Sequence, residues 1–209
     1  MGPSGRASIR VMPFLDEEDA VALTSYKAEW PAEYAELAYT IRGLDLASLG
    51  MIEHVGSTAI PDLVAKDVID VQIRVPDLDA ELVIARFTAA GFRHRPEPWN
   101  NLEATRLGVY PQLVFAPPIG ARHANVHTRA QNSPGAHDTL LFRDYLRAEE
   151  GPRLQWGDLK QSIVRGKSVD LATYGQAKQA TWAELMTGAD QWALEHEWRP
   201  RPLLAWSML

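Results

Sequence analysis

Apolar and polar positions recur with two different periods along this chain, and the change of period separates its front from its rear. In the front, the two alternate with a period of two over several short runs, which predicts strands. In the rear, apolar side chains recur every three to four positions, which predicts helices. The predicted strands are Met51–Val55, Val68–Val75, Leu107–Ala116 and Arg122–Ala130, and the predicted rear helices are about 135–149, 152–165 and 170–187.

The front also carries helical signals between its strands. One helix is predicted to begin at Trp30-Pro31 and to end near Gly43, because proline is tolerated in a first helical turn. Another is predicted over about 78–90, ended by Gly91. Residues 16–25 predict a short acidic helix, and the polar, proline-containing stretch 95–106 predicts a loop.

These elements divide the chain into four parts. We expect a flexible start and short helix over 1–25, an α/β core over 26–131, a helical part over 132–192 and a tail over 193–209. The helical part opens at Ser133-Pro134, an N-cap residue followed by proline at the first helical position.

Composition narrows the class of protein. The 209 residues suffice for one sizeable core, and 46% of them are apolar. The net charge of −6 argues against a non-specific grip on nucleic acid. The absence of cysteine excludes disulfides and thiolate chemistry. Without an apolar leader or a membrane-length apolar run, we expect a soluble cytoplasmic protein with no membrane partner.

Two of the predicted strands carry one apolar and one polar face. In the first strand Asp70, Gln72 and Arg74 share a face, because side chains alternate along a strand. In the second strand His123, Asn125, His127 and Arg129 share a face. An ordinary solvated face would account for such alternation, but Asp, Gln, His and Asn are also the residue types of functional sites. We therefore expect Asp70, Gln72, Asn125 and His127 to line one cleft.

The histidines suggest a metal, but strand geometry restricts that interpretation. His123 and His127 would lie about 13 Å apart on a strand, too far to share one ion. Asp70 with a single histidine would then be the core of any metal site.

Two lysines stand out in the predicted rear helices. Lys160 and Lys178 each fall within an apolar stripe at helical spacing. Each stem could simply pack while the ammonium reaches water. Alternatively, with Arg129 and Arg143, the two lysines would bind an anionic ligand where the sheet meets the helices.

The segment from residue 52 to residue 75 has a recognisable form. It reads Ile-Glu-His-Val-Gly56-Ser57-Thr58-Ala-Ile-Pro and then Lys66-Asp67-Val-Ile-Asp70-Val-Gln72. A Gly-Ser-Thr turn after a strand can present backbone N–H groups to a phosphate. The run resembles the signature of the GrpB family (UPF0157), and most of all the GrpB domain fused to dephospho-CoA kinase in actinobacteria.

Further motifs extend the resemblance over about residues 25–187. They are Tyr26-x-x-x-Trp30-Pro31, Asn125-Val126-His127-x-Arg129, Asn132-Ser133-Pro134, the run Leu140–Arg147, Lys160, and Tyr174-x-x-x-Lys178.

The resemblance implies a nucleotidyltransferase-like fold, a mixed sheet flanked by helices with a C-terminal helical subdomain. It implies that Gly56, Ser57 and Thr58 form the phosphate-binding turn and that Asp70 is a metal-binding carboxylate, with Mg²⁺ as the candidate ion. Nucleotidyltransferases place a second carboxylate two residues further on, where this chain has Gln72, a poor magnesium ligand.

The leading hypothesis is a transferase-like enzyme that acts on an anionic, phosphate-bearing small molecule or nucleotide, with Asp70, His127 and Lys66 as catalytic residues. One alternative is a small-metabolite enzyme that uses His127 and Asp70 as acid or base without nucleotidyl transfer. The other is a non-catalytic ligand-binding or accessory module. Gln72 favours the two alternatives, because fold does not fix function.

Overall fold

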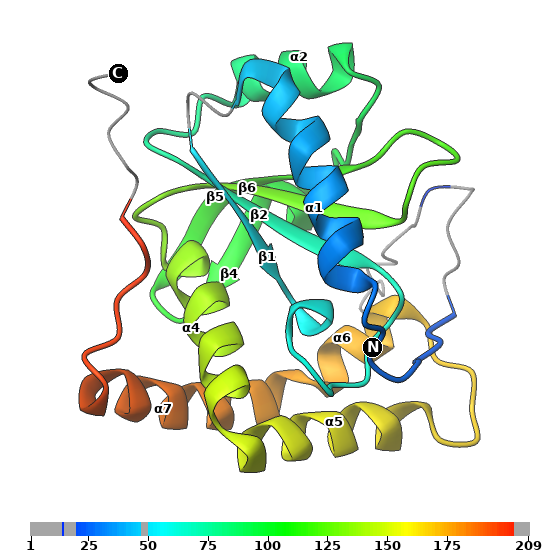
Figure 1. The fold of residues 1–209 in the computed structure, drawn as a ribbon, viewed down its shortest axis with the longest axis vertical. Helices are drawn as coiled ribbons and strands as arrows, with labels where there is room; N and C mark the ends of the chain where they lie inside the picture. The colour runs from blue at the N-terminus through cyan, green and yellow to red at the C-terminus, as the bar shows by residue number, and fades with distance from the viewer. Residues whose placement is uncertain (1–13, 15–19, 47–49, 203–209) are drawn as a thin grey trace, which may run out of the picture.

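The computed structural model describes Phe14, residues 20–46 and residues 50–202 (Figure 1). The predicted flexible start, the first residues of the predicted acidic helix and the end of the predicted tail lie outside the described residues.

A mixed sheet forms the centre of the described chain. Its strands are β1 (Met51–Val55), β2 (Ile69–Val75), β3 (Arg93–His94), β4 (Leu102–Thr105), β5 (Gly108–Ala116) and β6 (Ala124–Ala130). They lie in the order β1-β2-β6-β5-β3, and β4 pairs with β5. Strands β2 and β6 are parallel, whereas the other pairs are antiparallel. The parallel pair aligns Asp70 with Asn125 and Gln72 with His127, so the two polar faces form one side of the sheet.

The apolar side of the sheet holds one core. Ile69, Val71 and Ile73 are buried there, as the alternation predicts. Two helices cover them, α1 (Trp30–Ile41), which a π-turn at Arg42–Leu46 continues, and α2 (Ala80–Ala89). Trp30 of α1 and Phe87 of α2 are fully buried.

The polar side faces the helical rear. The rear consists of α4 (Pro134–Ala148), α5 (Glu150–Val164), α6 (Leu171–Ala177) and α7 (Gln179–Glu195). Ser133 caps α4 by accepting a hydrogen bond from the Ala136 N–H. Helices α5, α6 and α7 lie together below the sheet in Figure 1. A second core joins α4, α5 and α7 to Ile60 and Leu63 of the segment after β1, so this segment lies between the sheet and the helices.

The prediction of a helix at residues 16–25 is wrong for its described part. Residues 20–25 are extended, and Ala20 and Thr24 form isolated bridges with Asp170 and Ala65. The backbone of this stretch pairs with distant segments of the chain, so local helical propensity does not decide its conformation.

The predicted loop at 95–106 is also wrong, because it contains α3 (Pro98–Asn101) and β4. In β4 the apolar Leu102 is exposed while Glu103 is partly buried. This reverses the pattern that identifies a strand in sequence.

The predicted helix at 170–187 is two helices, α6 and α7, and α7 continues to Glu195. The break falls at Lys178. Among the described residues, no helix combines the length and the apolar character needed to cross a membrane.

Candidate functional site

The turn after β1 brings the backbone against Asp70. Gly56 has φ +69°, a conformation that favours glycine. A Cβ there would lie 2.3 Å from Asp70 Oδ2 and 2.8 Å from Asp70 Cβ. Residue 56 must therefore be glycine for two reasons, its conformation and the closeness of the carboxylate. The short 3₁₀ turn Ser57–Ala59 follows directly.

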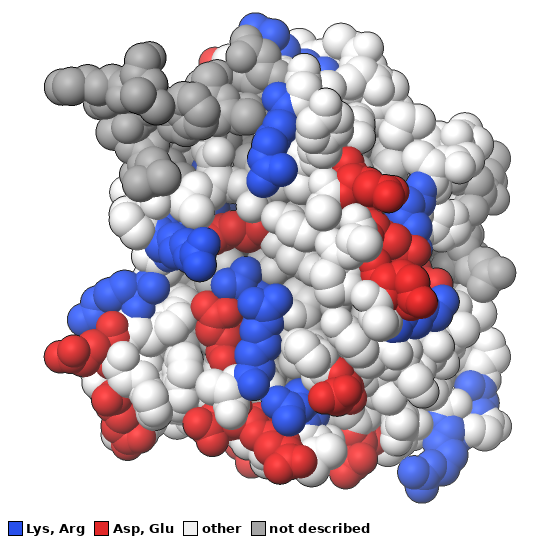
Figure 2. All heavy atoms as spheres, in the orientation of Figure 1, with Lys and Arg blue, Asp and Glu red and all other residues white. Residues whose placement is uncertain are grey.

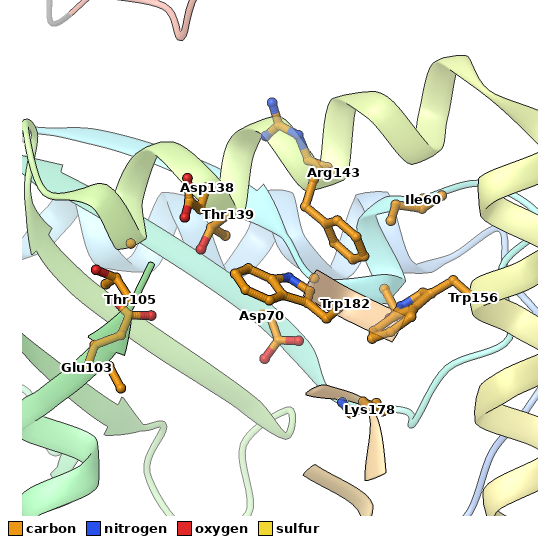
Figure 3. Close-up of a pocket in the computed structure, with 15 residues that line it drawn as sticks. Ile60, Asp70, Glu103, Thr105, Asp138, Thr139, Arg143, Trp156, Lys178 and Trp182 are labelled. Carbon is orange, nitrogen blue, oxygen red and sulfur yellow. The ribbon is translucent and has the colours of Figure 1, made fainter. Parts of the chain in front are cut away.

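A pocket of about 320 Å³ opens beside this turn, and this volume is large enough for a small ligand. Figure 3 shows Asp70 within it, with Trp182 and Lys178 on either side of the carboxylate. Fifteen residues line it: Gly56, Ser57, Ile60, Asp70, Glu103, Ala104, Thr105, Gly135, Asp138, Thr139, Phe142, Arg143, Trp156, Lys178 and Trp182. They come from the turn, β2, β4, α4, α5, the α6–α7 junction and α7, so the pocket lies where the sheet meets the helical part.

Asp70 differs from the two other carboxylates of the pocket wall. Arg129 pairs with Glu103 and Arg106 pairs with Asp138. Asp70 instead accepts a hydrogen bond of 3.0 Å from the Asn125 side-chain amide. Burial raises the pKa of Asp70, although the Asn125 hydrogen bond and the nearby Lys66 and Lys178 charges act against the rise. Burial therefore favours the protonated form of Asp70.

Lysines supply positive charge at the same place. Lys178 lines the pocket, and its ammonium lies 4.4 Å from the centre of the Tyr174 ring and 5.8 Å from that of Trp156. Burial and then repulsion from Lys66 lower the pKa of Lys178 to about 8, although Asp70 opposes the change. The fully buried Lys160 donates to Ser57 Oγ at 3.1 Å and to the Val64 carbonyl. Burial and the Lys178 charge lower its pKa to about 7.

Aromatic rings form another part of the pocket wall. Phe142 meets Trp156 edge-on, with ring centres 5.2 Å apart, and Trp182 lies 6.3 Å from Phe142. All three line the cavity. They offer apolar surface and flat ring faces to a planar group of a ligand.

Gln72 and Arg129 belong to a buried network beside the pocket. Gln72 is fully buried, donates to the Ala136 carbonyl at 3.1 Å and accepts from Arg129 at 2.9 Å. Arg129 also makes two hydrogen bonds of 2.8 Å to Glu103. Gly135 leaves room for this pair, because a Cβ there would lie 1.8 Å from Glu103 Oε2. These contacts join β2, β4, β6 and α4, and they occupy the polar groups of both residues.

The structure places the remaining predicted residues around the pocket without gathering all of them on its wall. His127 shares the sheet face of Asp70, but its Nδ1 is buried without a hydrogen-bond partner among the described residues. Burial and the charges of Arg129 and Arg95 hold the pKa of His127 well below its usual value, so it is neutral. Thr58 is buried and contacts His54. Arg143 borders the pocket, but in Figure 3 its guanidinium points away from Asp70, and it donates to Asp144 and to the His54 carbonyl.

Sequence reasoning missed several wall residues. Glu103 and Thr105 lie in the stretch predicted to be a loop, and Asp138 lies in the first turns of α4. Trp156 and Trp182 fall in the same apolar stripes as Lys160 and Lys178, and that shared spacing was the available signal for them.

The donor set does not fit a resident metal ion. Among the described residues, no three His, Cys, Asp or Glu side chains form a group able to hold one. Asn125 occupies one Asp70 oxygen, and Lys66 and Lys178 place positive charge beside it. Glu103 is tied to Arg129. A divalent ion would therefore depend on a ligand for most of its coordination.

This geometry defines a mixed α/β protein with a ligand-sized, charged and aromatic pocket between its sheet and its helical part. The chain belongs to the GrpB family, because the family model described as GrpB protein matches residues 20–187.

Known proteins are similar to this chain in sequence or in fold. The chain is 29% identical over 197 residues to a dephospho-CoA kinase of Mycolicibacterium paratuberculosis, covering 86% of this chain and 48% of that protein. It is 30% identical over 161 residues to a UPF0157 protein of Streptomyces coelicolor, covering 76% and 78%. The crystal structure of GrpB from Enterococcus faecalis superposes with a TM-score of 0.68 at 22% identity, over 85% of this chain and all of that one.

Two conclusions follow from these likenesses. The predicted fold class, a mixed sheet flanked by helices with a helical C-terminal part, is confirmed. The chain spans less than half the length of the dephospho-CoA kinases that it matches.

Proposed function

We propose that this protein is an enzyme that acts on a phosphate-bearing small molecule of nucleotide size, bound in the Asp70 pocket. One observation carries the proposal: a carboxyl group with a raised pKa, a lysine with a lowered pKa and the Gly56-Ser57 turn border the same cavity. Perturbed groups of opposite charge in one cleft are typical of sites that bind and transform a ligand.

Lysine side chains support binding of the phosphate. Lys178 lines the cavity, and Lys160 donates a hydrogen bond to the Ser57 hydroxyl. The lowered pKa values of about 8 and about 7 show that burial opposes both charges. A bound phosphate would supply the missing counter-charge, so binding would raise both pKa values.

The aromatic wall supports a ligand with a planar part. Phe142, Trp156 and Trp182 line the cavity together with Gly56 and Ser57 of the turn. A nucleotide has a flat base that such rings can contact and phosphates that the lysines can neutralise. Dephospho-CoA also fits this description, and relatives of the chain carry the name dephospho-CoA kinase.

Asp70 supports catalysis in addition to binding. Its raised pKa allows it to take a proton from a hydroxyl or a water molecule of the bound complex, or to return one. The Asn125 amide holds one oxygen, so the carboxyl group has a fixed orientation. His127 is the weaker candidate for this role because it does not line the cavity.

The binding test uses calorimetry with ATP, dephospho-CoA and adenosine, first without and then with Mg²⁺. We expect the phosphate-bearing compounds to bind and adenosine to bind far more weakly. Lys178→Met keeps the apolar stem and should weaken binding on the order of tenfold, as expected for loss of one charge-assisted contact. Lys167→Met, at an exposed lysine of the loop after α5, is the matched control and should bind as the wild type does.

Two outcomes would contradict the proposal. One is that no phosphate-bearing compound binds. The other is that Lys178→Met and Asp70→Asn bind and turn over the compounds as well as the wild type. Binding that survives in Asp70→Asn while turnover disappears would support the catalytic role of Asp70.

A further inference from the structure

A second pocket lies on the other side of the turn that borders the Asp70 pocket. It has a volume of about 440 Å³ and is lined by Tyr26, Pro31, His54, Ala59, Pro61, Asp62, Arg147 and Arg153. His54 pairs with Val71 in the sheet, and Val71 belongs to the apolar side that α1 covers. The two pockets therefore share the turn but open on different sides of it.

Backbone carbonyls hold the guanidinium groups of this second pocket. Arg147 Nε donates to the Ala59 carbonyl at 2.7 Å. Arg153 Nη1 donates to the carbonyls of Leu146 and Arg147, at 3.1 and 3.2 Å. These bonds fix the positions of the two groups but do not neutralise their charges, because a carbonyl carries no net charge.

Neighbouring carboxylates do little to neutralise the two arginines. Asp144 Oδ1 is 3.8 Å from Arg147 Nη1, but the same oxygen accepts from Arg143 Nε at 2.7 Å. Within the described part of the chain, no ion pair joins Asp62 to either arginine of the pocket wall. In Figure 2 the Lys and Arg side chains over α4 on this face lie beside Asp and Glu side chains.

The electrostatic effect on neighbouring groups is consistent with this arrangement. Burial and the charges of Arg147 and Arg143 lower the pKa of His54 to about 4, so the imidazole is neutral and adds no charge. Burial and the Arg143 charge also lower the pKa of Arg147. The pocket wall therefore carries two guanidinium groups, Arg147 and Arg153, and one carboxylate, Asp62, and both guanidinium groups are fixed with N–H donors left over.

We infer that this second pocket is a phosphate-binding site, in which Arg147 and Arg153 bind one phosphate dianion. Two guanidinium charges match the two charges of a phosphate group, and each guanidinium can donate two parallel hydrogen bonds to its oxygens. The pocket is open enough to admit the anion, because the Arg147 side chain is 41% exposed. The phosphate belongs either to free inorganic phosphate or to a phosphorylated small molecule.

The test is an NMR titration of the full chain with sodium phosphate at constant pH and ionic strength, with sodium chloride as the reference. We expect saturable shifts at the His54 ring, the Ala59 amide and the Arg147 Nε–H. Titration with glycerol 3-phosphate separates the two sources: tighter binding than inorganic phosphate indicates a phosphorylated small molecule, and weaker binding indicates the free ion. Shifts no larger than those caused by chloride would overturn the inference.

Variants assign the site. Arg153→Gln should weaken phosphate binding on the order of tenfold, because it removes a charge-assisted contact. Arg165→Gln, at the exposed end of α5, is the matched control and should leave binding unchanged. Lys178→Met should also leave the His54 shifts unchanged, which separates this site from the Asp70 pocket. Loss of the shifts in Lys178→Met, or their persistence in Arg153→Gln, would contradict the assignment.

Discussion

Asp67 and Asp70 lie three positions apart, and their surroundings shift their pKa values in opposite directions. Asp67 receives hydrogen bonds from Lys27 and Trp30, which lower its pKa to about 2 in spite of partial burial. Burial raises the pKa of Asp70, and the Asn125 hydrogen bond offsets only part of the rise. The charged form of Asp67 thus stabilises the fold, whereas burial disfavours the charged form of Asp70.

Asp70→Asn is predicted to raise the thermal stability at pH 7. The raised pKa means that the unfolded chain ionises more readily than the folded one, so stability falls as the pH rises from about 4 through the folded pKa. Asparagine removes this cost and still accepts from Asn125. The melting temperatures of wild type and variant should converge toward pH 4, which calorimetry between pH 4 and pH 8 would measure.

Asp67→Asn is the matched control, with the opposite sign. Because the folded pKa of Asp67 is lowered, its contribution is present above about pH 4 and disappears as the pH falls toward 2. The variant should melt below the wild type at pH 7. A melting temperature of Asp70→Asn below that of the wild type at pH 7 would mean that the Asp70 charge stabilises the fold.

For single residues, the sequence predicted which face of the sheet a side chain lies on, but it did not predict how deeply that side chain is buried. Alternation placed Asp70 and Gln72 on one side of β2, and the register with β6 confirms that side. Alternation could not show that Gln72 lies under α4 while Asp70 faces a cavity. Depth depends on which helix covers which part of a strand, and that is a tertiary property.

Among the elements, β4 contributes three of its four residues to the wall of the Asp70 pocket. Its Glu103 enters the pocket wall and binds Arg129 of β6, which in turn binds Gln72 of β2. Arg129 is almost completely buried, so its charge depends on this carboxylate. A four-residue strand therefore compensates a charge inside the sheet.

Glu103→Ala is predicted to destabilise the protein by roughly 3 kcal/mol, because it leaves the buried Arg129 guanidinium without its carboxylate partner. Arg129→Met in the same background should regain part of the loss, since no charge is then left unpaired. Glu36→Ala, at an exposed position of α1, should change stability little. Urea unfolding of the four proteins tests this. A double variant less stable than Glu103→Ala alone would show that the guanidinium has other adequate partners.

Element prediction succeeded where the pattern was strong and failed where tertiary contacts reversed it. Alternation identified β2, β5 and β6, and helical spacing identified α4 and α5. In β4 and the turn after it, Leu102 and Leu107 are exposed, so the apolar positions there face outward and no alternation identifies β4. The sequence pattern did not reveal the break between α6 and α7 at Lys178, because both helices carry apolar stripes and neither proline nor glycine separates them.

In the molecule as a whole, two pockets share one turn. Ser57 and Ile60 border the Asp70 pocket, while Ala59 borders the arginine pocket. Helix α4 reaches both, through Arg143 to the His54 carbonyl and through Arg147 to the Ala59 carbonyl. Hydrogen bonds from α4 therefore fix the backbone at this turn, and the position of the helical part determines the shape of both cavities.

Arg106 connects the hairpin to the helical part across the Asp70 pocket. Its guanidinium makes two hydrogen bonds to Asp138 of α4, at 2.8 and 3.0 Å, and it also pairs with Asp190 of α7. Thr105, the residue before Arg106, lies on the pocket wall. Both paired carboxylates lie on helices, so Arg106 holds the hairpin against them.

Arg106→Gln is predicted to loosen the hairpin while the core stays folded. The Arg106 side chain is one-third exposed, so solvent screens the ion pairs and their loss should cost about 1 kcal/mol, or roughly 2–4 °C in melting temperature. Amide hydrogen exchange should accelerate over 102–110, where β4 pairs with β5, and stay unchanged in β2 and β6. Arg165→Gln removes an exposed arginine that lies outside the pocket wall and should show neither effect. Equal exchange of the hairpin in Arg106→Gln and wild type would mean that strand pairing alone holds this wall of the pocket, and that the contact with α4 and α7 contributes nothing to its closure.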